Sequence, residues 1–566
     1  MNAAPLARAD RWLAVALAVA ATLVVALSAQ GLGFTRDEGY YFKAAEQYWG
    51  WFARLGEAPS EALSAPGIDR GWGYNHEHPV LMKTLFAWSY GVSQGLGLIS
   101  KEGAWQVHDA MRLPAWCFAG LSVALTFLLA RTLLPRRAAL VAALLWFSLP
   151  HPFWHMHVAC FDVGATAAHT WLVLGYLRWG RSARGALAVG VLFGLAAAVK
   201  HNVLLVPALF VLHWALTEAG PLRVEESGWR LPRLPLAFFS LALVGPVVFY
   251  LHWPWLWPDP LMRVGQYLAF HLRHEHYPIL YFGTLWTHPP FPIHFPFVMS
   301  AVTVPLGALV LMGVGIVLAA VVALRFLLGR FGPPRPLELT RVPLGEIARE
   351  PSGSPALLLL LNAFMPFVLI ALPSTPIFGG TKHWMNGLPF LCVLCAWALE
   401  EACARLRALG VRRTGLAFKV LAVLIVLPGF WSSARVWPNG LGGYNELIGF
   451  ERGAANVGMQ RTFWGYEPRA ALPLVNERAP PGARIHFGDT NQDSWRMYQR
   501  DALLRGDIGW SGSVRGAMVA SVQPQGEFKQ QWLDVWNEWG DRSPDMVLHA
   551  GGVPVLTLTF KAKDAP

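Results

Sequence analysis

The sequence has 566 residues, of which 54% are hydrophobic and only 14% are Asp, Glu, Lys or Arg. Because an average soluble domain carries about 25% charged residues, this composition excludes a chain of ordinary globular domains and indicates a polytopic membrane protein. The net charge of +11 comes from short Arg clusters between apolar runs, a pattern that argues against a nucleic-acid partner and is typical of cytoplasmic loops.

The first apolar run, at about 12–29, is long enough to span a bilayer. A cleaved signal peptide is the alternative, but we expect a retained helix whose N-terminus is cytoplasmic because Arg8 and Arg11 precede it. Both interpretations place the next residues, GFTRDEGYYF from Gly33 to Phe42, on the outer side of the membrane.

An amphipathic helix is predicted from this stretch onward. Thr35 or Asp37 can cap a helix that begins at Asp37 or Glu38. Its apolar face comprises Tyr41, Ala45, Tyr48, Trp49 and Phe52, as in helices that lie along a membrane interface. The helix fixes Asp37 and Glu38 at the outer mouth of the bundle, although such a pair can equally cap a helix and face water.

The next apolar segment, HPVLMKTLFAWSYGVSQGLGLIS, resembles a span but fits the topology poorly. If it crossed the membrane, the following helix, at about 113–134, would run outward and place Arg136 and Arg137 outside. The distribution of Lys and Arg therefore favours a segment that lies on the surface. Residues 31–112 are accordingly predicted to form one large external loop with interfacial helices.

The remaining apolar runs alternate in direction and bring the total to roughly eleven spans within residues 1–432. They are predicted at about 138–154, 163–179, 185–199, 203–216, 236–251, 297–324, 356–371, 387–399 and 417–430. Residues 433–566 then lie outside as a small periplasmic α/β domain. Its predicted strands are ARIHFGD and MVLHAGGVPVLTLTF, and its predicted amphipathic helices are NQDSWRMYQRDALLR and EFKQQWLDVWNEWG.

Ionisable residues from distant parts of the chain are predicted to gather at the outer helix ends, where such residues are functional candidates. They are the acidic pair, Glu77, His78 and Lys83 of NHEHPVLMK, Arg112, Asp162 of HMHVACFD, Lys200 and His201 of AAAVKHN, and Lys382 and His383 of GGTKHW. Transfer from an anionic lipid-phosphate donor needs a carboxylate that takes a proton from the acceptor and cations that hold the departing phosphate.

RDEGYYF, HEHPVLMK, ACFD, AVKHNVLLVP and GGTKHWMNGLPF resemble motifs of the polytopic GT-C glycosyltransferases. The most similar families are the protein O-mannosyltransferases and the bacterial lipid A aminoarabinose transferases, which are family 39-like enzymes. The resemblance covers about 37–464, and GGYNELIGFERGAANVGMQRTFWG resembles a bacterial branch of the superfamily. The family commonly has two prolines after the His of the first loop, where this chain has Pro79 and then Val80.

The resemblance implies a GT-C fold and an inverting transfer of a sugar from a polyprenyl-phosphate donor, on the periplasmic face of the bacterial inner membrane. It implies that Asp37 is the general base, that Glu38 supports it and that Asp162 is the second acidic residue of the site. Topology alone suggests the residues that bind the donor phosphate. These are Arg112, Lys200, His201, Lys382 and His383.

The loop at 252–297 contains HLRHEHYPILYFGTLWTHPPFPIH, whose His residues suggest a metal site. Its spacing contains no four-ligand pattern, so we expect no metal cofactor, with a divalent ion as the open alternative. The favoured interpretation is an outer loop that shapes the donor or acceptor pocket. It assigns His274, His276, Tyr277 and Tyr281 to that pocket, together with Glu77, His78 and Lys83.

Two other functions compete with the enzyme. A secondary transporter would carry its charges near the midplane and show repeated halves, whereas here the charges lie at outer helix ends and no repeat is evident. A non-catalytic protein of lipid-linked glycan assembly is the second alternative, and the acidic pair argues against it. The sequence leaves the sugar open, and it leaves the acceptor open among lipid A, a surface glycan and a Ser or Thr of a protein.

Overall fold

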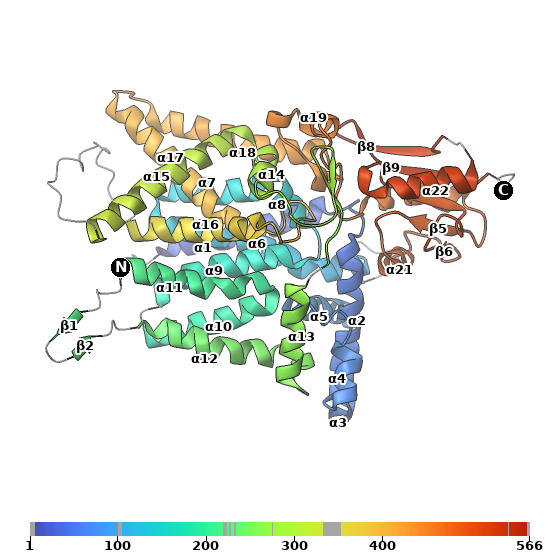
Figure 1. Cartoon of the computed structure of the whole chain (residues 1–566), viewed down its shortest axis with the longest axis horizontal. Helices are drawn as coiled ribbons and strands as arrows, with labels where there is room; N and C mark the ends of the chain where they lie inside the picture. The colour runs from blue at the N-terminus through green and yellow to red at the C-terminus, as the bar shows by residue number, and fades with distance from the viewer. Residues whose placement is uncertain are drawn as a thin grey trace.

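The computed structural model describes residues 6–99, 105–180, 182–218, 223–225, 228–230, 234–273, 275–331, 353–540 and 543–562. A bundle of long helices forms one part of the molecule, and a small sheet with flanking helices lies beyond one end of the bundle (Figure 1). The described part of the N-terminus and the strands β1 (Arg223–Glu225) and β2 (Gly228–Arg230) lie at the opposite end.

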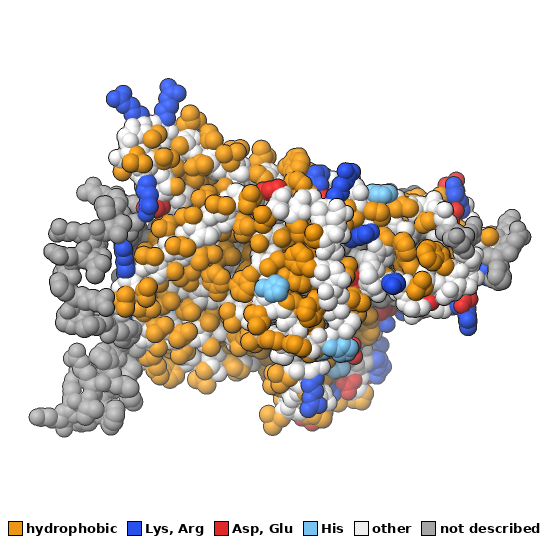
Figure 2. All heavy atoms as spheres, turned by 45° about the horizontal axis from the view of Figure 1, so that its top comes forward, with side chains coloured by type: hydrophobic (Ala, Val, Ile, Leu, Met, Phe, Trp, Pro, Cys, Tyr) orange, Lys and Arg blue, Asp and Glu red, His pale blue; other side chains and the backbone are white. Residues whose placement is uncertain are grey.

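The bundle confirms the prediction of a multi-pass membrane protein. Six of its helices are long and apolar enough to span a bilayer, and three shorter apolar segments accompany them among the described residues. The bundle contains α1 (Arg8–Ser28), α6 (Val107–Leu133), α7 (Arg136–Ser148), α9 (Phe161–Trp179), α10 (Ala183–Val199), α11 (Val206–Thr217), α12 (Leu236–Leu251), α15 (Leu306–Phe331), α16 (Gly353–Ala371), α17 (Leu388–Ala408) and α18 (Thr414–Arg435). Figure 2 shows hydrophobic side chains over the bundle surface, as contact with lipid requires. The total of eleven crossings stays a prediction.

Several predicted helix boundaries were wrong, and the helix predicted at 387–399, for example, continues to Ala408. The predicted helices at 138–154 and 297–324 are each split, into α7 and α8 (Pro150–His155) and into α14 (Phe295–Thr303) and α15. Pro150 and Pro305 lie at the breaks, where the missing N–H and the restricted preceding residue end a helix. Helix α6 begins well before the predicted residue 113, because Gln106 and Asp109 form a capping box at its start.

The segment predicted to be external consists of α2 (Arg36–Glu57), α3 (Pro59–Ala62), α4 (Ala65–Trp72) and α5 (Leu81–Gly95). Thr35 caps α2 and forms a capping box with Glu38. Tyr41, Ala45 and Tyr48 of the predicted apolar face are buried. Helices α2 and α13 (Pro260–Leu272) run across the axes of the bundle helices at the end next to the sheet (Figure 1), which is the orientation of interfacial helices.

The C-terminal sheet confirms the predicted small α/β region. Its strand order is β6-β5-β7-β9-β8, with β5 parallel to β6 and β7, and β9 antiparallel to β7 and β8. The strands are β5 (Arg484–Phe487), β6 (Gly509–Trp510), β7 (Val519–Val522), β8 (Met546–Ala550) and β9 (Val553–Phe560), and the helices of this part are α19 (Phe450–Asn456), α20 (Leu472–Arg478), α21 (Gln492–Arg500) and α22 (Lys529–Trp539). A separate hairpin of β3 (Ile279–Tyr281) and β4 (Thr284–Trp286) belongs to the 252–297 loop.

Helix α1 is an integral part of the bundle. Its buried Asp10 forms ion pairs with Arg131 and Arg136, at N–O distances of 3.0 and 2.6 Å. Gly120 of α6 brings the two helices together, because a Cβ at that position would lie 2.2 Å from the carbonyl oxygen of Ala18. The ion pairs join α1 to α6 and α7 near the N-terminus of α1, and the glycine contact joins α1 and α6 midway along both helices.

Candidate active site

A cavity of about 590 Å³ lies where the ends of α9 and α10 meet α2, the end of α13 and the loops between them. Nine of the residues predicted for the site line it: Asp37, Glu77, His78, Asp162, Lys200, His201, Tyr277, Lys382 and His383. Segments as distant as α2 and the turn before α17 meet there, which brings residues 345 positions apart into contact. The cavity is therefore the candidate active site.

Asp37 and Lys382 form an ion pair on the cavity wall. The Lys382 Nζ lies 3.3 Å from Asp37 Oδ2, and 23% of the Asp37 side chain is exposed. Two glycines with positive φ, Gly379 and Gly380, build the turn that presents this lysine. A Cβ at Gly379 would lie 2.7 Å from Lys382 Cε, so the turn and the lysine chain pack directly on each other. Lys382 Nζ also lies 4.2 Å from the ring centre of Trp464.

Asp162 and Lys200 form a second carboxylate–lysine pair in the same cavity. Asp162 lies in the first turn of α9 and Lys200 caps the C-terminus of α10, and their side chains are 6% and 14% exposed. Their hydrogen bond is 2.5 Å long. His201 packs against His271 at 3.9 Å between ring centres, and His383 Nε2 is buried with no hydrogen-bond partner among the described residues. Positively and negatively charged side chains thus converge on the same cavity.

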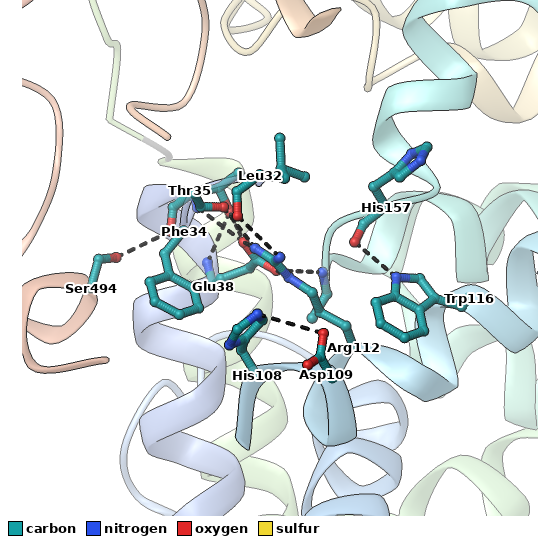
Figure 3. Close-up of polar contacts among 12 residues, drawn as sticks. Leu32, Phe34, Thr35, Glu38, His108, Asp109, Arg112, Trp116, His157 and Ser494 are labelled. Atoms are coloured by element: carbon teal, nitrogen blue, oxygen red, sulfur yellow. Dashed lines mark hydrogen bonds and ion pairs between the residues drawn. The ribbon is translucent and has the colours of Figure 1, made fainter. Parts of the chain in front are cut away.

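Glu38 lies outside the cavity, although it follows Asp37 directly. Its carboxylate is fully buried and accepts hydrogen bonds from Arg112 Nε at 2.7 Å and Arg112 Nη2 at 2.9 Å. The backbone N–H groups of Thr35 and Ala159 donate to it as well. Figure 3 shows Arg112 reaching from α6 toward Glu38 at the start of α2. The structure thus gives Glu38 a role in joining α2 to the bundle rather than a place beside the reacting groups.

Arg112 also differs from its predicted role at the donor phosphate. Its guanidinium is fully buried, and besides Glu38 it donates to the carbonyl oxygens of Leu32 and Gly33. A group enclosed in this way has no open side for a phosphate. The sequence placed it at a helix start, but the capping box moves that start upstream and turns Arg112 into the interior.

Four other predicted pocket residues do not line the cavity or cannot be placed. Lys83 is buried and donates to Asn75 and to the carbonyl oxygen of His78, so it supports the loop that carries Glu77. His276 packs on Phe291, and Tyr281 packs on Phe295. His274 lies outside the described residues.

The cavity also has lining residues that the sequence did not single out, among them Arg36, Tyr40 and Tyr74. Arg36 directly precedes Asp37, and Tyr40 lies one helical turn after Arg36. The 3.6-residue period of α2 therefore indicated that both residues lie close to the cavity. Tyr74 carried no such signal, because its position depends on the C-terminal sheet region.

Burial and neighbouring charges set the protonation of the surrounding groups. Burial, with a smaller contribution from Lys83, holds the pKa of His78 well below its usual 6.5, so this ring is neutral. Burial lowers the pKa of Lys83 to about 7. Burial raises the pKa of Asp489 to about 6, although Arg36 opposes this shift. Among the described residues no group of three His, Cys, Asp or Glu side chains is arranged to hold a metal ion.

Comparisons with known proteins agree with this architecture. A protein-family profile described as Dolichyl-phosphate-mannose-protein mannosyltransferase matches residues 93–250. No curated protein matches the chain in sequence. ArnT from Cupriavidus metallidurans in the apo state is 15% identical, with 98% of each chain covered and a TM-score of 0.50. The apo oligosaccharyltransferase of Archaeoglobus fulgidus is 14% identical, with 88% of this chain and 64% of that chain covered and a TM-score of 0.46.

The ArnT comparison spans the bundle, the external segment and the C-terminal region together, so the likeness concerns the whole fold. The sequence match covers α6 to α12, which includes Asp162 and Lys200. The chain therefore has the GT-C glycosyltransferase fold, and it resembles ArnT in structure and the protein mannosyltransferases in sequence.

Proposed function

We propose that the protein is a glycosyltransferase that moves a sugar from a polyprenyl-phosphate donor to a periplasmic acceptor with inversion. The observation that carries the proposal is the Asp37–Lys382 pair on the wall of a cavity at the outer end of a GT-C bundle. The description of the matching family profile names a dolichyl-phosphate sugar, which supports a lipid-phosphate donor.

The residues of the cavity suit each part of this reaction. The acceptor hydroxyl oxygen attacks the anomeric carbon, its proton passes to the Asp37 carboxylate, and the bond from the anomeric carbon to the phosphate oxygen breaks. The phosphate leaves with the bonding electron pair, and Lys382 and Lys200 stabilise its charge. Attack from the side opposite the phosphate inverts the anomeric carbon.

The two ion pairs give the resting cavity a defined starting state. Lys382 holds Asp37, and Lys200 holds Asp162, so each cation is neutralised by a carboxylate before a substrate arrives. A donor phosphate competes with Asp37 for Lys382. When the phosphate takes this lysine, the Asp37 carboxylate is released from the ion pair and is open to the acceptor hydroxyl. Donor binding thus prepares the base.

The test uses the purified full-length protein in detergent with a panel of polyprenyl-phosphate sugars and a bacterial envelope extract that supplies lipid, glycan and protein acceptors, and it measures release of free polyprenyl phosphate. Asp37→Asn keeps the shape of the side chain but removes its basicity, so turnover is expected to fall by roughly 10²-fold or more. Glu61→Gln is the control, because Glu61 is an exposed carboxylate of the same external segment that pairs with Arg54. Near-normal turnover in Asp37→Asn, or a wild-type protein that releases no polyprenyl phosphate from any donor, would refute the proposal.

The sugar and the acceptor are separate questions for the same protein. We propose a bacterial inner-membrane location with the cavity facing the periplasm, in keeping with the Arg-rich inner loops. Mass spectrometry of lipid A, surface glycans and glycosylated proteins from a deletion strain identifies the acceptor as the molecule that loses one sugar.

A further inference from the structure

The first turn of α2, which carries Asp37, is held from outside by the C-terminal region. The Arg36 side chain pairs with Asp489 at 2.9 Å, and its backbone N–H donates to the carbonyl oxygen of Trp464 at 2.9 Å. The Asn491 side chain donates to the Arg36 carbonyl oxygen at 2.7 Å, and Ser494 Oγ donates to the Thr35 carbonyl oxygen at 3.1 Å. The backbone immediately before the proposed base, at Thr35 and Arg36, is therefore fixed by residues from after 460.

Gly39 permits this close docking of α21 on α2. A Cβ at Gly39 would lie 2.5 Å from Ser494 Oγ and 2.6 Å from Asn491 Oδ1. Contacts of that length do not occur for real side chains, so any larger residue forces the two helices apart. Gly50, on the same helix, has no atom within 4 Å of the corresponding position.

Asp493 of α21 joins two walls of the cavity. Its carboxylate is 10% exposed, and it pairs with Lys43 of α2 at 3.3 Å. It also accepts a hydrogen bond of 2.7 Å from the hydroxyl of Tyr74, which lies in the loop after α4. Tyr74 lines the cavity, whereas Lys43 and Asp493 do not. The remaining side-chain contact of Asp493 is with Arg496 of its own helix, at 3.3 Å.

We propose that Asp493 is a positioning residue for the transfer reaction, which fixes the Asp37 helix and the Tyr74 loop at one distance from each other across the cavity. This inference rests on the proposed function. The effect is geometric: Asp493 touches no substrate, and it acts through Lys43 and Tyr74. An error of about 1 Å in the placement of reacting groups can lower a rate by roughly 10²-fold, so such a link matters for turnover.

The experiment compares Asp493→Ala, which removes both contacts, with Asp493→Asn, which keeps an acceptor for Tyr74 but loses the charge that pairs with Lys43. Steady-state release of polyprenyl phosphate gives kcat and KM, and hydrogen–deuterium exchange mass spectrometry reports on α2. We expect kcat to fall roughly ten- to a hundredfold in Asp493→Ala and less in Asp493→Asn, with donor KM within about threefold of wild type. Exchange in the first turns of α2 becomes faster in the same order.

Two controls separate positioning from general damage. Glu538→Gln breaks an exposed ion pair with Arg515 in the same region and should change neither kcat nor α2 exchange. Lys43→Met breaks the same link from the α2 side. If Asp493→Ala unfolds the sheet region, the amides of α22 lose protection from exchange. In that case the kcat and the α2 exchange of Lys43→Met test the proposal instead. Lys43→Met removes the ion pair with Asp493 and also the contact of Lys43 Nζ over the Tyr74 ring, at 4.3 Å. Its effect should therefore be at least as large as that of Asp493→Asn, and the double variant should lose little more than Lys43→Met alone.

The outcomes also distinguish this inference from the proposed function. Wild-type kcat and wild-type α2 exchange in both Asp493 variants would overturn the positioning role while leaving the transferase standing. A larger donor KM at unchanged kcat would overturn it too, because that result indicates substrate binding. If the wild-type protein has no transferase activity, the proposed function fails, and faster α2 exchange in the variants still measures the structural link.

Discussion

Substitution of Glu38 is expected to destabilise the fold, whereas substitution of its neighbour Asp37 is expected to stop only the chemistry. Glu38 accepts five hydrogen bonds, two from Arg112, two from Thr35 and one from the Ala159 N–H. Both Glu38 and Arg112 have side chains with 0% exposure. Glu38→Ala leaves the guanidinium charge buried without a carboxylate, a change that costs about 3–5 kcal/mol of folding free energy.

A loss of that size lowers the ratio of folded to unfolded protein roughly 10²- to 10³-fold or more. The assay is thermal unfolding in detergent, followed by tryptophan fluorescence and by the folded fraction on size exclusion. Glu38→Ala and Arg112→Met should each lower the transition temperature strongly, Glu38→Gln should lower it less, and Asp37→Asn should leave it unchanged. A Glu38→Gln protein with wild-type stability and no turnover would refute this reasoning and would place Glu38 in the catalytic machinery.

Three further outcomes are expected. Gly39→Ala lowers turnover, because its Cβ would lie 2.5 Å from Ser494 Oγ, whereas Gly50→Ala leaves turnover unchanged and stabilises α2 by about 0.5–1 kcal/mol; equal turnover in the two variants would contradict this. Burial raises the pKa of Glu467 to about 8, so between pH 5 and 8 the unfolded chain loses this proton while the folded protein keeps it. Stability therefore falls with rising pH by about 1.4 kcal/mol per unit for this group, and unfolding midpoints measured from pH 5 to 9 should show that Glu467→Gln removes this slope. Transfer should survive thorough chelation because Lys382 can neutralise the phosphate, and activity lost to EDTA but restored by one divalent metal would contradict that.

Local patterns in the sequence predicted much of the bundle and of the C-terminal region. The apolar run at 236–251 corresponds to α12, and the alternating residues at 484–487 form β5. Thr35 could be identified as a cap because its side chain and its position in the chain suffice for that role. Pro150 and Pro305 are visible in the sequence, but a prediction from hydropathy alone treats the apolar run around each proline as a single helix.

The roles of neighbouring polar residues could not be predicted in the same way. Asp37 and Glu38 have the same chemistry, and successive residues on a helix point about 100° apart. One carboxylate therefore faces the cavity and the other faces Arg112, but the sequence does not tell which, because the answer depends on where α6 packs. Tyr74 likewise lines the cavity with its hydroxyl bound to Asp493, a partner 419 residues later that no local pattern indicates.

The docking of α21 on α2 can form only after almost the whole chain has been synthesised. Lys43 and Asp493 are separated by 450 residues. At a translation rate of about 5–20 residues per second, the second partner is made roughly 20–90 s after the first. Throughout that interval the nascent chain can insert its helices, yet the helix that carries Asp37 lacks its outer support. The bundle helices are therefore synthesised first and α21, which holds α2 in place, is synthesised last. A chain that terminates before α21 is expected to be inserted but inactive.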